Sequence, residues 1–488
     1  MVMLIRMVSL LVASSVMVGC SFLPPHDTHS ANDDTASTSL SSDKNNANTD
    51  LDGTKPKYQP FEASTLFSLM VAEIAGQRQQ YAISLANYLD QAHKTQDPAV
   101  AERTTRIAQY LGSNKYAIEA ATIWTKTAPN DALAHQTLAQ ELLKSGDALT
   151  ALSHMEAEFD LTGDSQFDYL ALSSQNLEHA DKLTLLMQLE RLTKLHSDYA
   201  PLWMAQGSVL YQLEDYPFAL TCFENALAIK RNYTSAALNK ARTLHKLEQD
   251  EDALELLNKL HVDLPQHKGV GILRARVLID LKRFPEARAA FQQLSQQYNS
   301  DNSIKLSLAL LHMELSEFDE AIAILSALTL NNTMADNAYF YLARAAELQE
   351  DERRAINNYN QVQGGPQLLA ALVRVSNLLL DMEGLESAIA YIKQQRDEFP
   401  HYASELAQLE IELLIKHDDY EAAYQVADMA LSEDPDNTNL LYSRGLIAEK
   451  LGNLDQLETD LRKIIRINPQ DAEALKFYRH ICVTGFFS

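Results

Sequence analysis

Glycine and proline are scarce in this chain of 488 residues, which has 15 glycines and 14 prolines. Both residues fall below their usual shares of about 7% and about 5%. Turn-rich β-sandwiches, collagen-like repeats and long Gly/Pro linkers all need more of these two residues. The scarcity therefore argues against all three architectures.

Cysteine is scarcer still, since the chain has only three. That number is too small for a disulfide framework. Cys20 ends an apolar N-terminal segment, and Cys222 lies in an apolar helical stretch where a small core residue is expected. Cys482 is far along the chain from both, so no disulfide is predicted.

Basic residues are outnumbered by acidic ones, 41 to 66, which gives a formal charge of −25. An acidic surface repels phosphate backbones and anionic headgroups. The charge therefore disfavours nucleic acid as a partner, and it also disfavours direct binding to anionic lipid.

Motifs that carry chemistry are absent from the sequence. We find no phosphate loop, nucleotide fingerprint, G-x-S-x-G elbow, H-E-x-x-H pair or paired CxxC motif. The histidines are scattered singly, as at His135, His154, His245, His312 and His417. We therefore expect no enzyme activity, no catalytic residue, no metal, no cofactor and no small-molecule substrate.

The N-terminal segment is predicted to be a targeting signal covering residues 1–19. Residues 7–18 form an apolar run that is too short to span a membrane, and Arg6 is the only charge before it. The tetrapeptide from Met17 to Cys20 resembles a bacterial lipobox, which implies cleavage before Cys20 and acylation of that residue. By the same resemblance, Ser21 favours the outer membrane. Ordinary secretory cleavage beside an incidental cysteine is the alternative.

Residues 20–60 are predicted to be the lipidated cysteine followed by a disordered linker. Of the 40 residues from 21 to 60, 21 are Ser, Thr, Asn or Asp. Such a segment cannot bury enough apolar surface to offset the entropy lost on ordering. The folded body is therefore expected to begin at Phe61.

Small residues recur every 34 positions in the rest of the chain. The series consists of Ala117, Ala151, Leu185, Ala219, Ala253, Ala287, Ala321 and Ala355. Ala82 is interpreted as an earlier member, and Ala388, Ala423 and Leu457 continue the series with slips of one residue. A fixed period of this length is typical of stacked helical hairpins, because a small residue is needed where the two helices cross.

Residues 200–233 resemble the tetratricopeptide repeat (TPR). The matching residues are Trp203, Gly207, Tyr216, Ala219, Phe223 and Ala226. The resemblance implies an all-α fold, a right-handed TPR α-solenoid of about twelve hairpins within residues 61–471. Second helices of several units are expected to end before a proline, at Pro129, Pro265, Pro400, Pro435 and Pro469.

Residues 472–488 depart from this pattern and are predicted to be an incomplete, aberrant terminal repeat. Ala474 and Leu475 fit a first helix, but no second helix follows. A truncated or frameshifted reading frame would explain the segment, and a docking tail is the alternative.

The resemblance also places a candidate groove along the first helices of the repeats. Four units have arginine at the ninth position: Arg106, Arg242, Arg276 and Arg344. Apolar or aromatic residues hold the fifth position in several units: Met204, Leu238, Ile272, Leu306, Phe340 and Tyr442. Such a mixture suits an extended peptide whose carboxylates pair with arginine. The alternative is local pairing, for instance of Arg276 with Asp280 one turn on.

A closer resemblance covers most of the folded chain. Residues 64–112, 164–175, 439–450 and 467–475 are similar to an outer-membrane TPR lipoprotein family of proteobacteria. Members of that family are adaptors that bring peptidoglycan hydrolases to a periplasmic carboxyl-terminal processing protease. The resemblance implies a lipid-anchored, periplasm-facing scaffold with protein partners. A component of a secretion, pilus or exopolysaccharide export machine is the alternative function.

Overall fold

The computed structural model describes residues 62–483, and helices make up the regular secondary structure of that part. The predicted signal peptide (1–19), Cys20 and the linker (20–60) lie outside the described residues, as do residues 484–488 of the predicted terminal repeat. Contacts divide the chain into two units at Pro60, and the second unit contains all the described helices.

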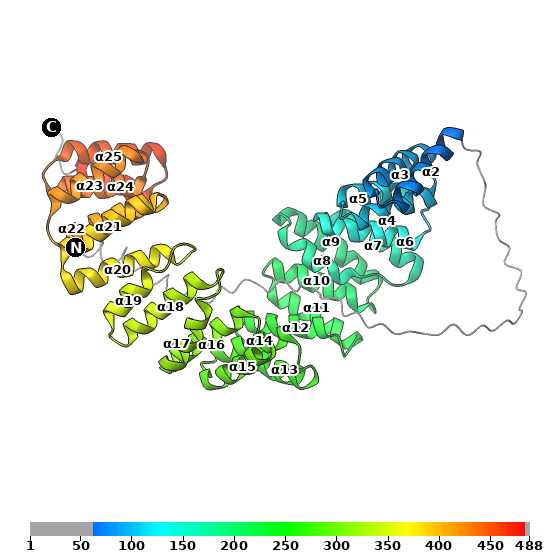
Figure 1. Cartoon of the computed structure of the whole chain (residues 1–488), viewed down its shortest axis with the longest axis horizontal. Coiled ribbons are helices and arrows are strands. Elements are labelled where there is room, and N and C mark those ends of the chain that lie inside the picture. The colour runs from blue at the N-terminus through cyan, green and yellow to red at the C-terminus, as the bar shows by residue number, and fades with distance from the viewer. Residues whose placement is uncertain (1–61, 484–488) are drawn as a thin grey trace, which may run out of the picture. The chain divides into compact units, whose positions relative to one another are not determined.

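The helices pair with their sequence neighbours, and the pairs follow one another in chain order (Figure 1). The first three pairs are α2 (Ala63–Gln77) with α3 (Tyr81–Thr95), α4 (Pro98–Tyr110) with α5 (Asn114–Thr127), and α6 (Ala132–Ser145) with α7 (Ala148–Thr162). After an irregular segment and α9 (His179–Leu195), the next are α10 (Ala200–Gln212) with α11 (Tyr216–Ile229), α12 (Thr234–Lys246) with α13 (Asp250–Asp263), α14 (Lys268–Asp280) with α15 (Phe284–Gln297), and α16 (Asn302–Glu314) with α17 (Phe318–Leu328). The last are α18 (Ala335–Leu348) with α19 (Glu352–Tyr359), α20 (Leu368–Glu383) with α21 (Leu385–Glu398), α22 (Ala403–Lys416) with α23 (Tyr420–Glu433), and α24 (Thr438–Lys450) with α25 (Leu454–Ile467). A short 3₁₀ turn, η4 (Pro400–Tyr402), precedes α22, and α26 (Ala472–Val483) follows α25.

One hairpin does not have a complete first helix. Before α9 the chain forms only η2 (Phe167–Tyr169), the four-residue α8 (Leu170–Ser173) and η3 (Ser174–Asn176). The described residues hold 25 α-helices. The expectation of about twelve complete hairpins fails here, because this hairpin lacks a full-length first helix. A distant contact stabilises the irregular backbone, because the Gln212 side-chain amide donates to the Ala171 carbonyl oxygen at 2.7 Å.

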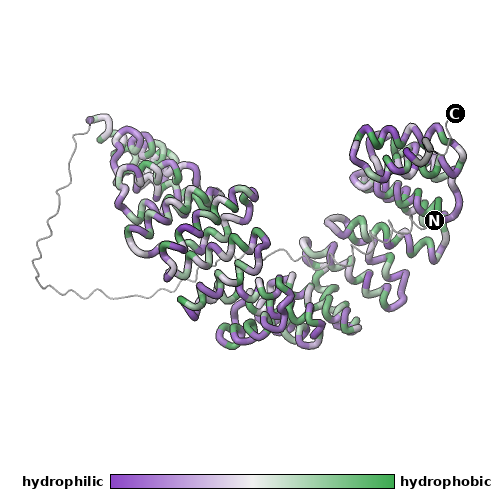
Figure 2. Tube along the Cα trace, turned by 180° about the vertical axis from the view of Figure 1, so that it is seen from behind, coloured by the Kyte–Doolittle hydropathy of each residue, from purple (hydrophilic) through white to green (hydrophobic). Residues whose placement is uncertain are grey.

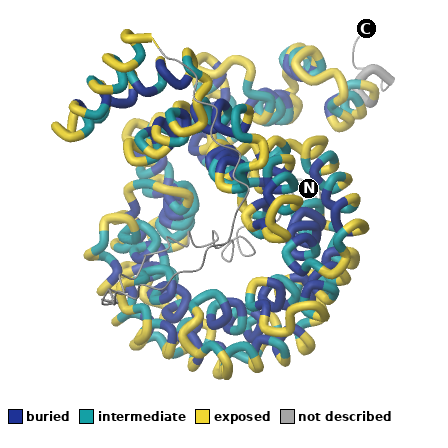
Figure 3. Tube along the Cα trace, turned by 90° about the vertical axis from the view of Figure 1, so that its right-hand side faces the viewer, coloured by how far each residue is buried: buried dark blue, intermediate teal, exposed yellow. Residues whose placement is uncertain are grey.

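The 34-residue series marks the contact between the two helices of each hairpin. All eight members from Ala117 to Ala355 are fully buried, as are Ala388, Ala423 and, at 1% exposure, Leu457. Figure 3 shows buried residues recurring on the sides where helices face each other. Ala82 is an exception, since it is exposed near the start of α3. Its neighbours Ser84 and Leu85 point inward instead, so the inclusion of Ala82 in the series was wrong.

Proline ends the second helix of five hairpins as predicted. In each case the helix stops two residues before the proline, at Thr127, Asp263, Glu398, Glu433 and Ile467. Proline disfavours helical backbone angles at the residue before it. The sequence therefore determines where these helices end.

A left-handed residue makes the turn inside almost every hairpin. Its positions also repeat every 34 residues: Gly112, Gly146, Glu214, Glu248, Lys282, Ser316, Glu350, Gly384, Asp418 and Gly452 all have positive φ. The missing position, 180, falls inside α9 of the irregular hairpin. Six of these ten residues are not glycine, although a side chain disfavours this conformation.

Apolar side chains fill the space between consecutive hairpins rather than one central core. Figure 2 shows hydrophobic and hydrophilic residues alternating along each helix, as amphipathic helices require. Cys222 is 4% exposed and packs with Phe223 and Met204, so its prediction as a core residue is confirmed. Burial raises the pKa of its thiol to about 12.

The last described helix, α26, packs against α25 and α24. Ala474 is fully buried, and Phe477 and Tyr478 are half-buried against the apolar cluster of these helices. The Arg462 guanidinium donates through Nε to the Tyr478 hydroxyl at 3.1 Å. The first half of the predicted incomplete repeat therefore contributes to the packing of the array.

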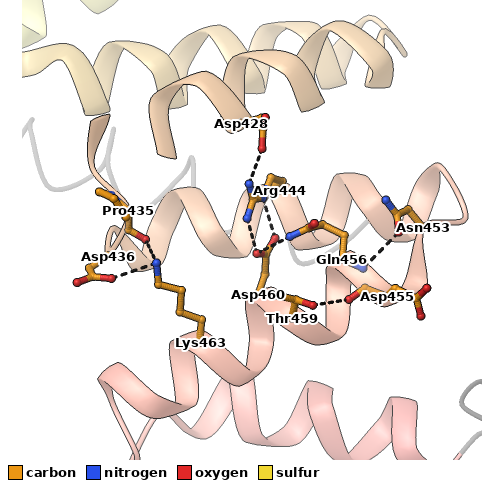
Figure 4. Close-up of polar contacts among 10 residues, drawn as sticks. All are labelled: Asp428, Pro435, Asp436, Arg444, Asn453, Asp455, Gln456, Thr459, Asp460 and Lys463. Atoms are coloured by element: carbon orange, nitrogen blue, oxygen red, sulfur yellow. Dashed lines mark hydrogen bonds and ion pairs between the residues drawn. The ribbon is translucent and has the colours of Figure 1, made fainter. Parts of the chain in front are cut away.

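Buried carboxylates link neighbouring helices near this end. The Asp460 side chain on α25 is 1% exposed and accepts two hydrogen bonds from Arg444 on α24, at 2.6 and 3.0 Å (Figure 4). The Gln456 amide donates to the same carboxylate at 2.9 Å, and Arg444 also reaches Asp428 on α23 at 2.6 Å. One arginine thus joins three consecutive helices.

Candidate functional site

The four arginines of the predicted groove all lie on first helices, at α4, α12, α14 and α18. Arg106 pairs with Glu102 one turn earlier at 2.5 Å, and Arg344 lies 3.8 Å from Glu347. Arg242 donates to the Asn239 amide oxygen at 3.3 Å. Local partners are therefore present, as the alternative interpretation of these residues expected.

Arg276 lies among the charges that meet between α12 and α14. Burial raises the pKa of the Asp280 carboxyl, and the charges of His245 and Arg276 oppose that rise. His245 contacts two carboxylates, with Nδ1 at 2.6 Å from Asp250 and Nε2 at 3.3 Å from Asp280. These polar contacts link consecutive hairpins.

The apolar residues of the predicted groove are mostly interior. Met204 is 4% exposed, and Leu238, Leu306 and Phe340 are each 9% exposed. Ile272 and Tyr442 are half-buried and pack against neighbouring clusters. Because the next hairpin covers the fifth position, these side chains leave little surface for a ligand.

A cavity of about 380 Å³ opens between α2, α3 and α4. Seven of the residues that line it bear polar groups or aromatic rings: Glu73, Gln77, Tyr81, Ser84, Arg103, Arg106 and Tyr110. Arg106 is the predicted groove residue that lies here. Arg106 on α4 therefore belongs both to the predicted groove and to the observed cavity.

The cavity wall is held by a charged network. The Tyr88 hydroxyl donates a short hydrogen bond to Glu73, and Arg103 Nη2 lies 3.5 Å from the same carboxylate oxygen. Burial and this bond to Glu73 raise the pKa of Tyr88 to about 12. The Tyr81 and Tyr110 rings contact each other with centroids 4.8 Å apart.

Sequence reasoning missed most of these residues. Arg103, Arg106 and Tyr110 are spaced by three and four positions, so they share one face of α4. That spacing was a usable signal, but the repeat rule selected only Arg106. Glu73 and Ser84 carry no pattern that distinguishes them from other helical residues.

The described residues also bear on metal binding and on membrane insertion. No group of three His, Cys, Asp or Glu side chains there is arranged to hold a metal ion. Across residues 62–483, no helix is both long and apolar enough to cross a bilayer.

Comparison with known proteins gives matches to tetratricopeptide repeats. Two family models, both described as tetratricopeptide repeat, match residues 278–347 and 438–471. The TPR repeat-containing protein PA4667 of Pseudomonas aeruginosa is 36% identical over 419 residues, which cover 86% of this chain and 71% of that protein.

Solved structures with similar helical arrays were also found. The crystal structure of yeast Tom70 covers 85% of this chain and 99% of its own, at 12% identity and a TM-score of 0.35. The structure of a thermophilic TPR protein from Thermus thermophilus covers 37% of this chain and 100% of its own, at 23% identity and a TM-score of 0.30.

Proposed function

Because the chain belongs to the tetratricopeptide repeat family, we propose that it is a non-catalytic scaffold that binds other proteins. In this proposal Cys20 is acylated and anchors the chain in the outer membrane. The array faces the periplasm and brings cell-wall hydrolases to a carboxyl-terminal processing protease.

The continuous array supports this proposal more than any other observation. From α2 to α26 the described chain consists of stacked helices and short connections. An array of this kind presents long surfaces, which suit partners that bind along several repeats. The similarity to a TPR repeat-containing protein extends over 419 residues, so it covers most of the array.

Affinity capture from detergent-solubilised membranes tests the proposed role. Tagged full-length chain is expected to recover a periplasmic protease together with peptidoglycan hydrolases. Recovery of secretin or pilus subunits without either enzyme would contradict the adaptor role and favour an export or pilus machine.

The anchor has its own test. Cys20→Ser is expected to leave the chain soluble in the periplasm or uncleaved in the inner membrane. Recovery of this variant in the outer-membrane fraction at the wild-type level would rule out lipidation of Cys20 as the anchor.

A further inference from the structure

The first described helix, α2, has an apolar face that no described helix covers. Four large apolar side chains recur along it at spacings of three and four residues, and each is close to half exposed or more: Leu66 at 48%, Phe67 at 69%, Met70 at 54% and Ile74 at 45%. Residues at these spacings share one side of a helix. Among the described helices, α2 packs chiefly against α3, at the N-terminal end of the array (Figure 1).

The repeat register identifies the counterparts of this face in other hairpins. Ser84 is the fourth residue of α3 and is 1% exposed, just as Ala219 is the fourth residue of α11 and is fully buried. Gln79 has a φ of 61° five residues before Ser84, and Glu214 has a φ of 63° five residues before Ala219. Ser84 therefore takes the place of the series residue in the first hairpin.

The counterparts of Phe67 and Ile74 are interior in later hairpins. Seventeen residues before the series residue lie Leu202, Val270, Ile304, Leu406 and Leu440, none of them more than 1% exposed. Ten residues before it lie Val209, Val277, Leu311, Leu413 and Ile447, none of them more than 5% exposed. These side chains are buried because the second helix of the preceding hairpin covers them, as α9 covers Leu202 and Val209 through Leu189.

Helix α2 thus has the surface of an interior first helix rather than that of an end cap. Terminal repeats normally present a polar outer face, and exposed apolar surface marks a contact site. The element that fits this face is a helix lying along α2, in the place that a preceding second helix would take.

The sequence before α2 is not suited to supply that helix. Between residues 24 and 57 the only large apolar residues are Leu40 and Leu51, and the apolar run at 7–18 belongs to the predicted signal peptide. A covering helix needs an apolar residue every three or four positions. We therefore expect the covering helix to come from a second molecule.

Charge favours a second copy of this chain as that molecule. Each chain has a formal charge of −25, so two copies repel each other where acidic surfaces meet. Glu73 is the only charged residue of α2, and its carboxylate accepts a hydrogen bond from Tyr88 and lies 3.5 Å from Arg103. Two copies can therefore approach at α2, and a two-fold contact covers both apolar faces at once.

We infer that two copies of this chain pair through antiparallel α2 helices. Met70 of each copy lies near the two-fold axis, and Phe67 of one copy faces Ile74 of the other. One helix from each chain makes a small interface, so the dimer forms in a concentration-dependent way. The inference goes beyond the proposed adaptor role and does not depend on it.

Disulfide cross-linking of the full-length chain in the membranes of the producing cells tests the pairing. Met70→Cys is expected to give an oxidised dimer at least about fivefold faster than Met187→Cys, because pairing raises the effective concentration of the two thiols. Met187 on α9 is the matched control, since it is 63% exposed and lies far along the chain from α2. The wild type gives the background. Equal rates for the two variants would overturn the inference.

Light scattering on the full-length chain in detergent gives a second test. Phe67→Glu with Ile74→Glu should raise the dimer dissociation constant at least about tenfold, since unpaired carboxylates are costly to bury. Phe218→Glu with Leu348→Glu, at sites that are 66% and 54% exposed, should leave it unchanged, and circular dichroism should show wild-type helix content in both. A wild-type chain that is monomeric at every concentration, or an α2 variant that still dimerises, would overturn the inference.

Affinity capture with the α2 variant distinguishes this inference from the adaptor role. If the wild type captures no protein while cross-linking through position 70 persists, the pairing stands and the adaptor role fails. If the wild type is monomeric and only the α2 variant loses the captured proteins, the adaptor role stands and a different protein covers α2, which overturns the pairing.

Discussion

Gly207 determines how closely α10 and α11 approach each other. A Cβ atom at this position would lie 2.8 Å from the Phe223 ring and 3.0 Å from Cys222 Cβ, neither of which can move easily. We expect Gly207→Ala to lower the free energy of unfolding by about 1 kcal/mol, because overpacking of about 1–3 kcal/mol exceeds the gain in helix propensity. Chemical denaturation measures the change.

Gly271 provides the matched control for this prediction. Its added Cβ would meet a terminal methyl group of Leu294 at 2.7 Å, and a flexible side chain can shift away. Gly271→Ala should therefore lose less stability than Gly207→Ala. Equal losses would show that the rigid ring is not the cause.

His135 and His154 form a hydrogen-bonded pair between α6 and α7. Their Nδ1 atoms are 2.9 Å apart, and His135 Nε2 lies 3.1 Å from the Pro129 carbonyl oxygen, which can only accept. His135 therefore donates through Nε2 and accepts through Nδ1 from His154. Both rings make this bond in the neutral form.

This pair is predicted to make folding sensitive to acid. Burial, and then the charge of His135, lower the pKa of His154 below its usual 6.5. The unfolded chain thus takes up a proton first as the pH falls, and the free energy of unfolding decreases below about pH 6.5. Urea unfolding at about pH 7.5 and about pH 5.5 should show a smaller decrease for His154→Gln than for the wild type.

An exposed histidine serves as the control for the pH prediction. His417 follows α22 and is exposed, so His417→Gln should leave the pH dependence of the wild type unchanged. If His154→Gln behaves like His417→Gln, the pair does not contribute to the acid sensitivity.

Among the helices, α24 and α25 depend on one another through Arg444 and Asp460. Removing the guanidinium leaves a carboxylate that is 1% exposed without its partner. We expect Arg444→Ala to lower the free energy of unfolding by about 3–5 kcal/mol, and the double variant with Asp460→Ala to lose less. A loss in the double variant as large as in the single one would contradict this explanation.

A surface ion pair gives the contrast for that prediction. Lys259 and Glu255 are one turn apart on α13, and both side chains are more than two-thirds exposed. Lys259→Ala should change stability by less than about 1 kcal/mol, because water screens exposed pairs.

The sequence predicts most helices but not all their contacts. The buried series from Ala117 to Ala355 and the prolines define hairpins because both act through local backbone sterics and close packing. Residues 167–176 do not follow the repeat pattern, because their backbone accepts a hydrogen bond from the side chain of Gln212, some 40 residues away. The fifth-position residues such as Met204 were expected in a groove, but the curvature and stacking that bury them are not local properties.

The candidate cavity was less predictable than the fold. Arg106 was found from its repeat position, whereas Ser84 and Glu73 take part only because α2, α3 and α4 meet there. A repeat rule describes an average unit. The first units differ in which side chains surround the space between helices, and only the structure shows this.

At the scale of the whole molecule, packing is concentrated between helices that are neighbours in chain order. In such an array, stability is the sum of local terms, and a local defect does not spread far. Hydrogen exchange of Arg444→Ala should increase within α22 to α26 and remain at the wild-type level in α2 to α9. Increased exchange along the entire chain would indicate a single cooperative unit instead.

The periodic left-handed turns have a consequence for heat tolerance. A side chain in this conformation is disfavoured by roughly 1–2 kcal/mol, and glycine removes that strain while adding about 0.4–1 kcal/mol of unfolded-chain entropy. Glu248→Gly and Glu350→Gly, at φ of 59° and 60°, should each raise the melting temperature in calorimetry. Their effects should add, because the turns are three repeats apart. We therefore expect the resistance of this protein to heating to rise through changes at its turns alone, without altering any residue of the cavity.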